Sequence, residues 1–395
     1  MGLFDDITVL SLEQATVLPF LTYRLAQEGM KIIRLEHPKF GDPNRFIGSN
    51  ILNEEGMNTY FLPNNCGKKA ITLNLRTPEG QKILRQLIET LNIDIFACNQ
   101  LPRNYPKLGI EYETLKKIKP DIIWVGITGF GPNSNEAAYD PILQARSGIM
   151  DLTGEKDGDP QVFGVPIADL GTSEHTFGQI MKALYKRKVT GKGSRIDMTM
   201  FISTVSWLVN PVMLTKSFHE KITRRGNTHQ FFAPVSVYPT SDGYVYIALG
   251  NDRQWDSFTN FPEFSHLKLP KYEKNAGRIA DVEHLNQEIS KVTKTITTDE
   301  IIRKFTEATI PISKVNTMED VIEDPLIKDA LITATDARSG LSVHLPPPVV
   351  TTDYLKTTNL QLSFPPRFGE HNEEIYGQLG YSDEDLKGFK EKGII

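Results

Sequence analysis

Short apolar runs alternate with amphipathic segments along the first two hundred residues. Such apolar runs are typical of buried strands, and the amphipathic segments are typical of helices that cover a sheet. The expected strands are residues 7–12, 31–35, 93–97, 122–126 and 195–200, and the expected helices are residues 20–28, 78–90, 171–188 and 207–214. The order of strand, helix and strand predicts a parallel sheet covered by helices, which is the α/β class.

The pattern changes near a basic segment, residues 221–225. Residues 235–249 read as two strands around a Ser-Asp-Gly turn, which is a hairpin signal. Helices are expected at 252–260 and 298–307 and a further strand at 312–315. We expect a smaller α+β region here, followed by a proline-rich tail that is a long return excursion rather than an independent domain.

Length and charge narrow the class of function. The 395 residues are enough for about two domains. With 44 basic and 49 acidic residues, the net charge of -5 gives no reason to expect nucleic acid or an anionic membrane as a partner. The two cysteines suit a reducing cytosol, and neither a secretory signal nor a membrane-spanning stretch is recognisable. We therefore expect a soluble, cytoplasmic protein.

Several familiar motifs are missing. The turn after residues 7–12 contains no glycine, so its backbone does not suit the pyrophosphate of a dinucleotide, and Glu36 is interpreted as a simple strand-end acid. Residues 67–69 and 190–194 lack the order of a P-loop and are interpreted as turns. No histidine pair has the i, i+4 spacing of a zinc site, and no Gly-x-Ser-x-Gly elbow occurs. Neither a metal site nor a serine nucleophile is expected.

Basic and amide side chains follow the early strands. They are His37, Lys68, Lys69, Arg76, Asn99, Arg103 and Lys107. Ligands of open α/β sheets bind beyond the carboxyl ends of the strands, so this set together can cradle a phosphorylated ligand. Each residue taken alone is more typical of a solvated surface.

Asp169 lies between an apolar run and the start of a small, polar helix. Its apolar flanks, residues 165–168 and Leu170, need an explanation because a carboxylate is usually exposed. Two interpretations are open. Asp169 either caps the helix by accepting bonds from its free N–H groups, or is held partly out of water and aimed at a bound substrate.

Motifs along the chain keep the order of a known family. They are Arg34-Leu-Glu-His-Pro38, Gly41-Asp42 with Arg45, residues 68–80, Lys107-Leu-Gly109, Ile127-Thr-Gly-Phe-Gly131, Pro166-Ile-Ala-Asp-Leu-Gly171, Thr190-Gly-Lys-Gly193, Gly369-Glu-His371 and residues 379–383. In this order they resemble the class III CoA-transferase family, which includes formyl-CoA transferase and α-methylacyl-CoA racemase. The resemblance implies a Rossmann-like large domain of residues 1–220 and 330–395, an inserted smaller α+β domain of residues 221–329, and an interlocked homodimer.

The resemblance also gives Asp169 the role of the catalytic carboxylate. Attack on an acyl-CoA thioester forms a mixed anhydride, and the released CoA thiolate then forms an aspartyl-CoA thioester that passes CoA to an acceptor acid. An unperturbed Asp is ionised at neutral pH, as this role needs, and backbone N–H groups near Gly171 or in the small domain are candidate oxyanion donors. The implied partners are an acyl-CoA, a carboxylic acid and a second copy of the chain. Coenzyme A is a co-substrate, and no prosthetic group is expected.

Positions that contact CoA in the family carry over one by one. They are Thr16, His37, Leu73, Asn74, Arg76, Asn99, Lys107, Ala138 and Tyr139. Relatives often carry Arg at the position of His37, and a neutral imidazole holds phosphate less firmly, so phosphate binding is expected to depend on Arg76 and Lys107. Racemase relatives place a His at the position of Tyr139, and an unperturbed Tyr is a poor base at neutral pH, which favours transfer over racemisation.

The identity of the acids and two other functions stay open. The glycine-rich loop of formyl-CoA transferases is missing after Gly250, which argues against formyl-CoA and oxalate. Arg253, or Arg224 with Arg225, either pairs with the free carboxylate of a dicarboxylic acid such as a succinyl or mesaconyl group, or is an ordinary surface arginine. The alternative functions are intramolecular CoA transfer or racemisation of an acyl-CoA, and CoA binding without catalysis.

Overall fold

The computed structural model describes residues 2–395 and divides into two compact units. The first unit runs to Ile149 and also contains Val162–Phe218 and Leu326–Ile395. The second unit consists of Met150–Gln161 and His219–Pro325.

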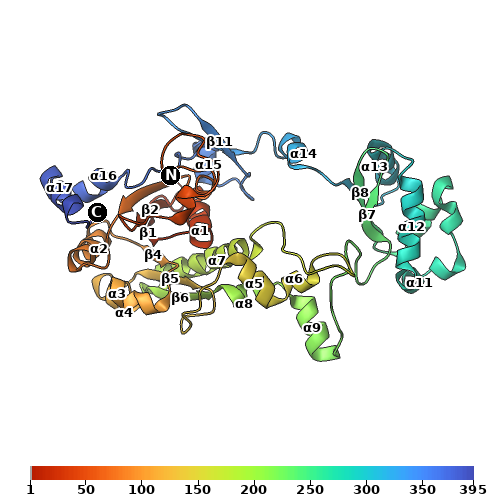
Figure 1. Ribbon diagram of the computed structural model, residues 1–395, viewed down its shortest axis with the longest axis horizontal. Helices are drawn as coiled ribbons and strands as arrows, with labels where there is room; N and C mark the ends of the chain where they lie inside the picture. Colours follow the sequence, from red (N-terminus) through yellow and green to blue (C-terminus); the bar gives the residue numbers. More distant parts are fainter. Residues whose placement is uncertain (1) are drawn as a thin grey trace. The chain divides into compact units, whose positions relative to one another are not determined.

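A six-stranded parallel sheet forms the centre of the first unit (Figure 1). Its strands are β1 (Thr8–Leu12), β2 (Lys31–Glu36), β3 (Lys68–Thr72), β4 (Ile95–Cys98), β5 (Ile123–Thr128) and β6 (Ser194–Thr199). Their order in the sheet is β3-β2-β1-β4-β5-β6, and every neighbouring pair is parallel. The sequence-based prediction of an α/β fold with a parallel sheet is confirmed. The order reverses between β1 and β4, where open α/β sheets bind their ligands.

Helices cover both faces of this sheet. They are α1 (Val17–Gln27), α2 (Pro78–Thr90), α3 (Tyr105–Leu108), α4 (Tyr112–Ile118), α5 (Asp140–Ser147), α7 (Ile167–Thr190) and α8 (Met200–Val205). The unit also contains α9 (Val209–Phe218) and the short 3-10 helices η1 (Pro43–Phe46) and η2 (Pro102–Asn104), and α6 (Ile149–Leu152) leads into the second unit. Successive residues of a strand point to opposite faces. Accordingly, Trp124 of β5 lies in a core with α2 and α4, while Val125 lies in a second core with α1 and α7.

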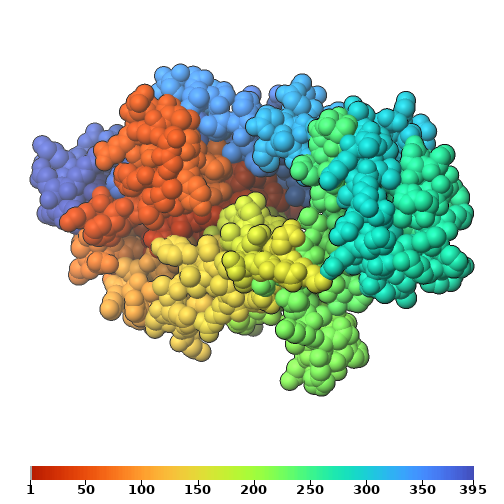
Figure 2. Space-filling view, turned by 45° about the vertical axis from the view of Figure 1, so that its right-hand side comes forward, coloured from red at the N-terminus to blue at the C-terminus, as the bar shows by residue number. Residues whose placement is uncertain are grey.

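The C-terminal segment completes the first unit. It contains the antiparallel pair β10 (Ile332–Thr335) and β11 (Ser342–Leu345) and helices α15 (Asp353–Thr357), α16 (Asn372–Gly377) and α17 (Asp383–Glu391). In both views this blue segment lies against the orange N-terminal residues (Figures 1 and 2). Asn372 Nδ2 donates to Thr72 Oγ1 at 2.8 Å, and the Asn74 N–H donates to the Ile394 carbonyl at 2.7 Å.

The second unit is a small α+β body. Its antiparallel sheet has the order β7-β8-β9, and its core contains Trp255, Phe258 and Phe305. The elements are β7 (Val235–Pro239), β8 (Tyr244–Ala248), β9 (Ile312–Lys314), α10 (Asp252–Thr259), α11 (Asn275–Ala280), α12 (Val282–Thr293), α13 (Thr298–Glu307), α14 (Met318–Glu323), η3 (Pro262–Leu267) and η4 (Pro270–Tyr272). Among residues 2–395, none of the helices combines the length and the apolar character that a membrane crossing requires.

Four expected elements differ from the structure by three residues or more. The helix predicted at 20–28 begins at Val17. Residues 67–69 are predicted as a turn, but Lys68 and Lys69 are the first two residues of β3, where the Lys68 ammonium finds oxygen partners inside the protein. The helix predicted from residue 171 begins at Ile167. The helix predicted at 207–214 is replaced by α8 and α9, with Trp207 in the turn between them, where its ring stacks on His175 at 4.9 Å.

Candidate functional site

Two loops at the reversal of strand order line three neighbouring cavities in the first unit. Residues 13–16 follow β1, and residues 99–101 follow β4. Gln14 and Gln100 line both a cavity of about 610 Å³ and a smaller one of about 100 Å³. Asp169 lines the smaller cavity and a third one of about 380 Å³. Because they share lining residues, the three cavities follow one another along the carboxyl edge of the sheet.

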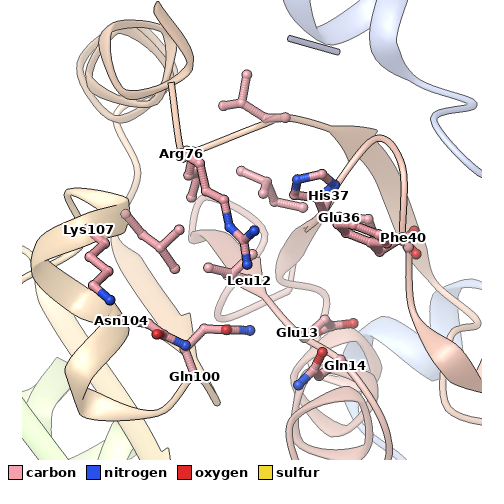
Figure 3. A pocket seen from close by; sticks show the side chains of 15 residues that line it. Leu12, Glu13, Gln14, Glu36, His37, Phe40, Arg76, Gln100, Asn104 and Lys107 are labelled. Atoms are coloured by element: carbon pink, nitrogen blue, oxygen red, sulfur yellow. The ribbon is translucent and has the colours of Figure 1, made fainter. Parts of the chain in front are cut away.

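The largest of these three cavities is lined by two cationic side chains. The Arg76 guanidinium and the Lys107 ammonium point into the same space, with His37 and Phe40 on another wall (Figure 3). Burial, with the nearby Arg76 and Lys39, lowers the pKa of His37, so its imidazole is neutral at pH 7. Of the side chains that line this cavity, only Arg76 and Lys107 are thus positively charged at neutral pH.

A buried ionic network lies beneath the loop after β1. Its six members are Glu13, Arg34, Glu36, Asp42, Arg45 and Lys68. Lys68 Nζ lies 2.7 Å from Glu13 Oε1, and Arg34 Nη2 lies 2.9 Å from Asp42 Oδ2. Burial alone would raise the pKa of Glu13, but Lys68 and Arg34 hold it below its usual value. Three acids face three bases, so the charges balance, as buried ions require.

Two predictions about this region are wrong. Glu36 is not a simple strand-end acid, because its carboxylate accepts from Arg45 Nε at 2.8 Å and Nη2 at 2.6 Å. Lys68 and Lys69, predicted to cradle a phosphate, lie at the amino end of β3. Lys68 is buried in the network, and Lys69 pairs with Glu374. Neither lysine lines the cavities that border Asp169 or the cavity that holds Arg76.

The network and Asn99 fix the glycine-free loop after β1. Asp42 Oδ1 accepts from the Ala15 N–H at 3.1 Å, and Asn44 Nδ2 donates to the Ala15 carbonyl at 2.7 Å. These contacts hold Ala15 at a φ of 61°, which is uncommon for a residue other than glycine. Asn99 accepts from the Gln14 N–H at 3.3 Å and donates to its carbonyl at 2.8 Å. Side chains therefore shape a turn for which the sequence provides no glycine.

Most of the residues predicted to contact CoA meet at these cavities. His37, Leu73, Arg76 and Lys107 line the largest cavity, and Thr16, Asn99, Ala138 and Tyr139 line the smallest one beside Asp169. Asn74 does not line them. Its side chain instead accepts from the Arg76 N–H at 3.1 Å and donates to the Gly393 carbonyl at 3.2 Å. Arg103 of the predicted phosphate cradle is exposed and does not line them either.

Asp169 is the third residue of α7, whose N-cap is Pro166. Asp140 Oδ1 accepts from the Ala168 N–H at 2.7 Å and from the Asp169 N–H at 3.2 Å. The capping interpretation of Asp169 is therefore wrong, because Asp140 caps the helix from another part of the chain. Within residues 2–395 no protein donor is bonded to the Asp169 carboxylate. Asp169 lines two of the cavities, so its carboxylate is available to a bound substrate.

The environment of Asp169 disfavours its charged form. Burial, and next the nearby Asp140 carboxylate, raise the pKa of Asp169 from 3.8 to about 7. The prediction of an unperturbed, fully ionised Asp is wrong for the free protein, in which both forms are populated near pH 7. The first turn of α7 favours the anion, since the N-terminus of a helix carries partial positive charge. A strongly shifted pKa in a cleft marks a candidate functional group.

The N–H of Gly171, one of the groups near which an oxyanion donor was expected, is not free to serve as one. Gly171 is buried inside α7, where its N–H takes part in the helix ladder. A Cβ atom added at this position would lie 2.8 Å from Trp207 Nε1. Gly171 thus allows Trp207 to pack against α7, and its N–H does not face the cavities.

The third cavity presents a mainly apolar wall beside Asp169. Ile47, Phe163 and Val165 line it together with Asn44 and Tyr60. None of the side chains that line it is a Lys or Arg. This cavity suits the carbon skeleton of a small organic acid.

The arginines predicted to bind a second carboxylate belong to the second unit. Arg224 Nη1 lies 2.9 Å from Asp151 Oδ1, and its Nε donates to the Gly158 carbonyl at 2.7 Å. Arg224 and Arg225 line a separate cavity of about 520 Å³, whereas Arg253 is exposed on α10.

Asp140 and its buried partner Gln144 were not predicted from the sequence. One signal was available: a proline has no side-chain oxygen to accept from the first N–H groups of a helix and no N–H of its own for a capping box, so a helix that follows Pro166 has to be capped by a residue from elsewhere in the chain. Across residues 2–395, no group of three or more His, Cys, Asp or Glu side chains is arranged to hold a metal ion.

Comparison with known proteins identifies the family of this chain. A family model described as CoA-transferase family III matches residues 4–372. The chain is 32% identical to a protein of Mus musculus named succinyl-CoA:glutarate CoA-transferase, over 99% of this chain and 90% of that protein. It is 30% identical to a succinyl-CoA:mesaconate CoA-transferase of Haloarcula marismortui, over 96% of this chain and 97% of that one. The crystal structure of a CAIB/BAIF family protein from Brucella suis matches with a TM-score of 0.82 at 31% identity, covering 94% of this chain and 98% of that one. The chain belongs to CoA-transferase family III and is a class III CoA-transferase.

Proposed function

We propose that this enzyme transfers CoA from an acyl-CoA thioester to a carboxylic acid through Asp169. The observation that carries the proposal is the position of the Asp169 carboxylate. Within residues 2–395 no protein donor is bonded to it. It lines both the mainly apolar cavity and the small cavity, and the small cavity in turn adjoins the cavity lined by Arg76 and Lys107. A nucleophile at this position meets the thioester carbon of an acyl-CoA whose pantetheine arm lies in the small cavity and whose acyl group lies in the apolar cavity.

The reaction consists of paired displacements at carbonyl carbon. An oxygen of ionised Asp169 attacks the carbonyl carbon of the thioester, and the C–S bond breaks. CoA leaves as a thiolate, and a mixed anhydride of Asp169 and the acyl group remains. The thiolate attacks the Asp169 carbonyl, which releases the first acid as its carboxylate and leaves an aspartyl-CoA thioester. The acceptor carboxylate then repeats these two steps in reverse order. Asp169 is regenerated as a carboxylate, and no net proton is taken up.

The cavities suggest how CoA lies. The phosphates bind Arg76 and Lys107, which supply charge-assisted hydrogen bonds. The pantetheine arm passes Gln14 and Gln100 to reach Asp169. Thr16, Asn99, Ala138 and Tyr139 line this last part of the path. His37, as a neutral imidazole, adds only hydrogen bonding or stacking.

We propose dicarboxylic acids as the substrates. The support is the names of the relatives, which act on succinyl-CoA with glutarate or mesaconate. Arg224, Arg225 and Arg253, which were expected to bind the distal carboxylate, do not line the cavities beside Asp169, so the proposal rests on the relatives' names alone. Racemisation is disfavoured because no His, the most common base for proton transfer near neutral pH, lines the two cavities that border Asp169.

We also propose that the first unit is the large CoA-binding domain, the second the small domain, and that two copies interlock as a homodimer. Large apolar side chains on α8 and α9 support a partner there. Ile202 is 66% exposed, Val209 70% and Phe218 62%. An exposed group of this kind is typical of a protein interface.

The test combines a substrate panel with trapping of the intermediate. Labelled acyl-CoA donors are incubated with a panel of mono- and dicarboxylic acids, and hydroxylamine or borohydride is added. We expect a modification of Asp169 detected by peptide mass, and none in Asp169→Asn. Turnover without modification of Asp169 contradicts the mechanism. Exchange of the α-proton in deuterated water without any acceptor acid would favour racemisation, and inertness towards every acyl-CoA would favour a binding protein.

A further inference from the structure

Gln144 is a buried side chain that the proposed reaction does not use. It lies on α5 and is 0% exposed. Its Nε2 donates to Asp140 Oδ2 at 2.5 Å, and its Oε1 accepts from the Phe163 N–H at 2.9 Å. The carboxylate accepts and the N–H donates, so the orientation of the amide is fixed by its two partners.

Asp140 needs this amide. Asp140 is only 6% exposed, and a buried carboxylate is stable only when donors satisfy it. Its Oδ1 is occupied by the N–H groups of Ala168 and Asp169, so Gln144 serves the other oxygen. Because Pro166 provides no side-chain cap, Asp140 is the acceptor that closes the first turn of α7.

The same amide is bonded to a residue of the apolar cavity wall. Phe163 lines that cavity together with Asp140 and Asp169. One buried side chain therefore connects the loop that forms the wall of the cavity with the acid that holds the backbone of Asp169. A shift of Gln144 would move both walls between which the acyl group reacts.

We propose that Gln144 is a positioning residue that holds Asp140 at the start of α7 and Phe163 at the cavity wall, and thereby sets the position of Asp169 against the acyl group. This inference rests on the proposed role of Asp169. Gln144 acts through Asp140 and Phe163 and does not touch the substrate. Small displacements of a nucleophile reduce the rate of the chemical step strongly while leaving distant binding contacts intact.

The test exchanges the donor and the acceptor of the buried pair. In Asp140→Asn two amide groups face each other, and in Gln144→Glu two carboxylates face each other. In the double variant the new amide at position 140 donates to the new carboxylate at position 144, while its oxygen still accepts from Ala168 and Asp169. We expect each single variant to lose about tenfold or more in kcat with the KM for acyl-CoA changed by less than about threefold, and the double variant to recover most of kcat.

Gln179→Glu on the exposed side of α7 is the matched control and should keep the wild-type kcat. Circular dichroism and CoA titration establish that each variant is folded and binds CoA. Wild-type kcat in both single variants, or a double variant no better than its singles, overturns the inference. If one single variant does not fold, the double is compared with the other one. Absence of Asp169 trapping in the wild-type enzyme would instead overturn the proposed function.

Discussion

At the scale of the residue, the reactivity of Asp169 depends on its protonation. Burial and then Asp140 raise its pKa to about 7, and Tyr139 and Glu136 line the same small cavity. Only the ionised form attacks a thioester, so we expect kcat/KM for acyl-CoA to rise with pH and level off above about pH 7, falling about tenfold per pH unit well below it. Initial rates between about pH 5 and about pH 9 provide the measurement. A profile that is flat from about pH 5 upward would contradict this environment of Asp169.

The same shift affects stability. The folded-state pKa of about 7 lies above the usual 3.8, so between these values the folded protein binds more protons than the unfolded chain, and its stability falls as pH rises. We expect Asp169→Asn to raise the free energy of unfolding above pH 7, by up to about 4 kcal/mol, and to have little effect near pH 4. Urea denaturation at fixed protein concentration measures the difference. A variant that is less stable than the wild type at pH 8 would contradict the conclusion that the folded protein disfavours the charged form of Asp169.

At the scale of the element, the turn after β3 and the short helix α3 each contribute one cationic side chain, Arg76 and Lys107, to the cavity of about 610 Å³. Arg76→Ala and Lys107→Ala should each weaken CoA binding about tenfold and reduce its dependence on salt, because charge-assisted hydrogen bonds to phosphate are lost. Titration calorimetry with CoA at two salt concentrations measures both effects. Arg103→Ala, in η2 just before α3, is the control, since its side chain is exposed and outside the cavity. Equal losses in all three variants would indicate a general effect of charge instead.

The elements also show how far the sequence alone could lead. Helix α2 has the predicted bounds because Pro78 occupies its first position and the Thr77 side chain caps it, both local signals. Strand β3 and the start of α7 were missed because their signals are not local. Lys68 is buried only because Glu13, 55 residues away, neutralises it, and α7 begins at Ile167 only because Asp140, 28 residues before Ala168, caps it. The position of Asp169 was predictable from its motif, whereas its raised pKa required the packed structure.

At the scale of the whole molecule, the proposed interlocked homodimer has a consequence that an ordinary dimer lacks. Two interlocked chains separate only if one of them unfolds, so exchange of subunits is limited by the rate of unfolding, which is slow in native conditions. We expect tagged and untagged homodimers to remain unmixed for days when incubated together, and to form mixed dimers after joint unfolding and refolding. Affinity capture followed by native mass spectrometry counts the species. Mixing within minutes in native buffer would mean that two copies associate through the apolar residues of α8 and α9 without interlocking. A protein that is monomeric at all concentrations would contradict the proposed homodimer.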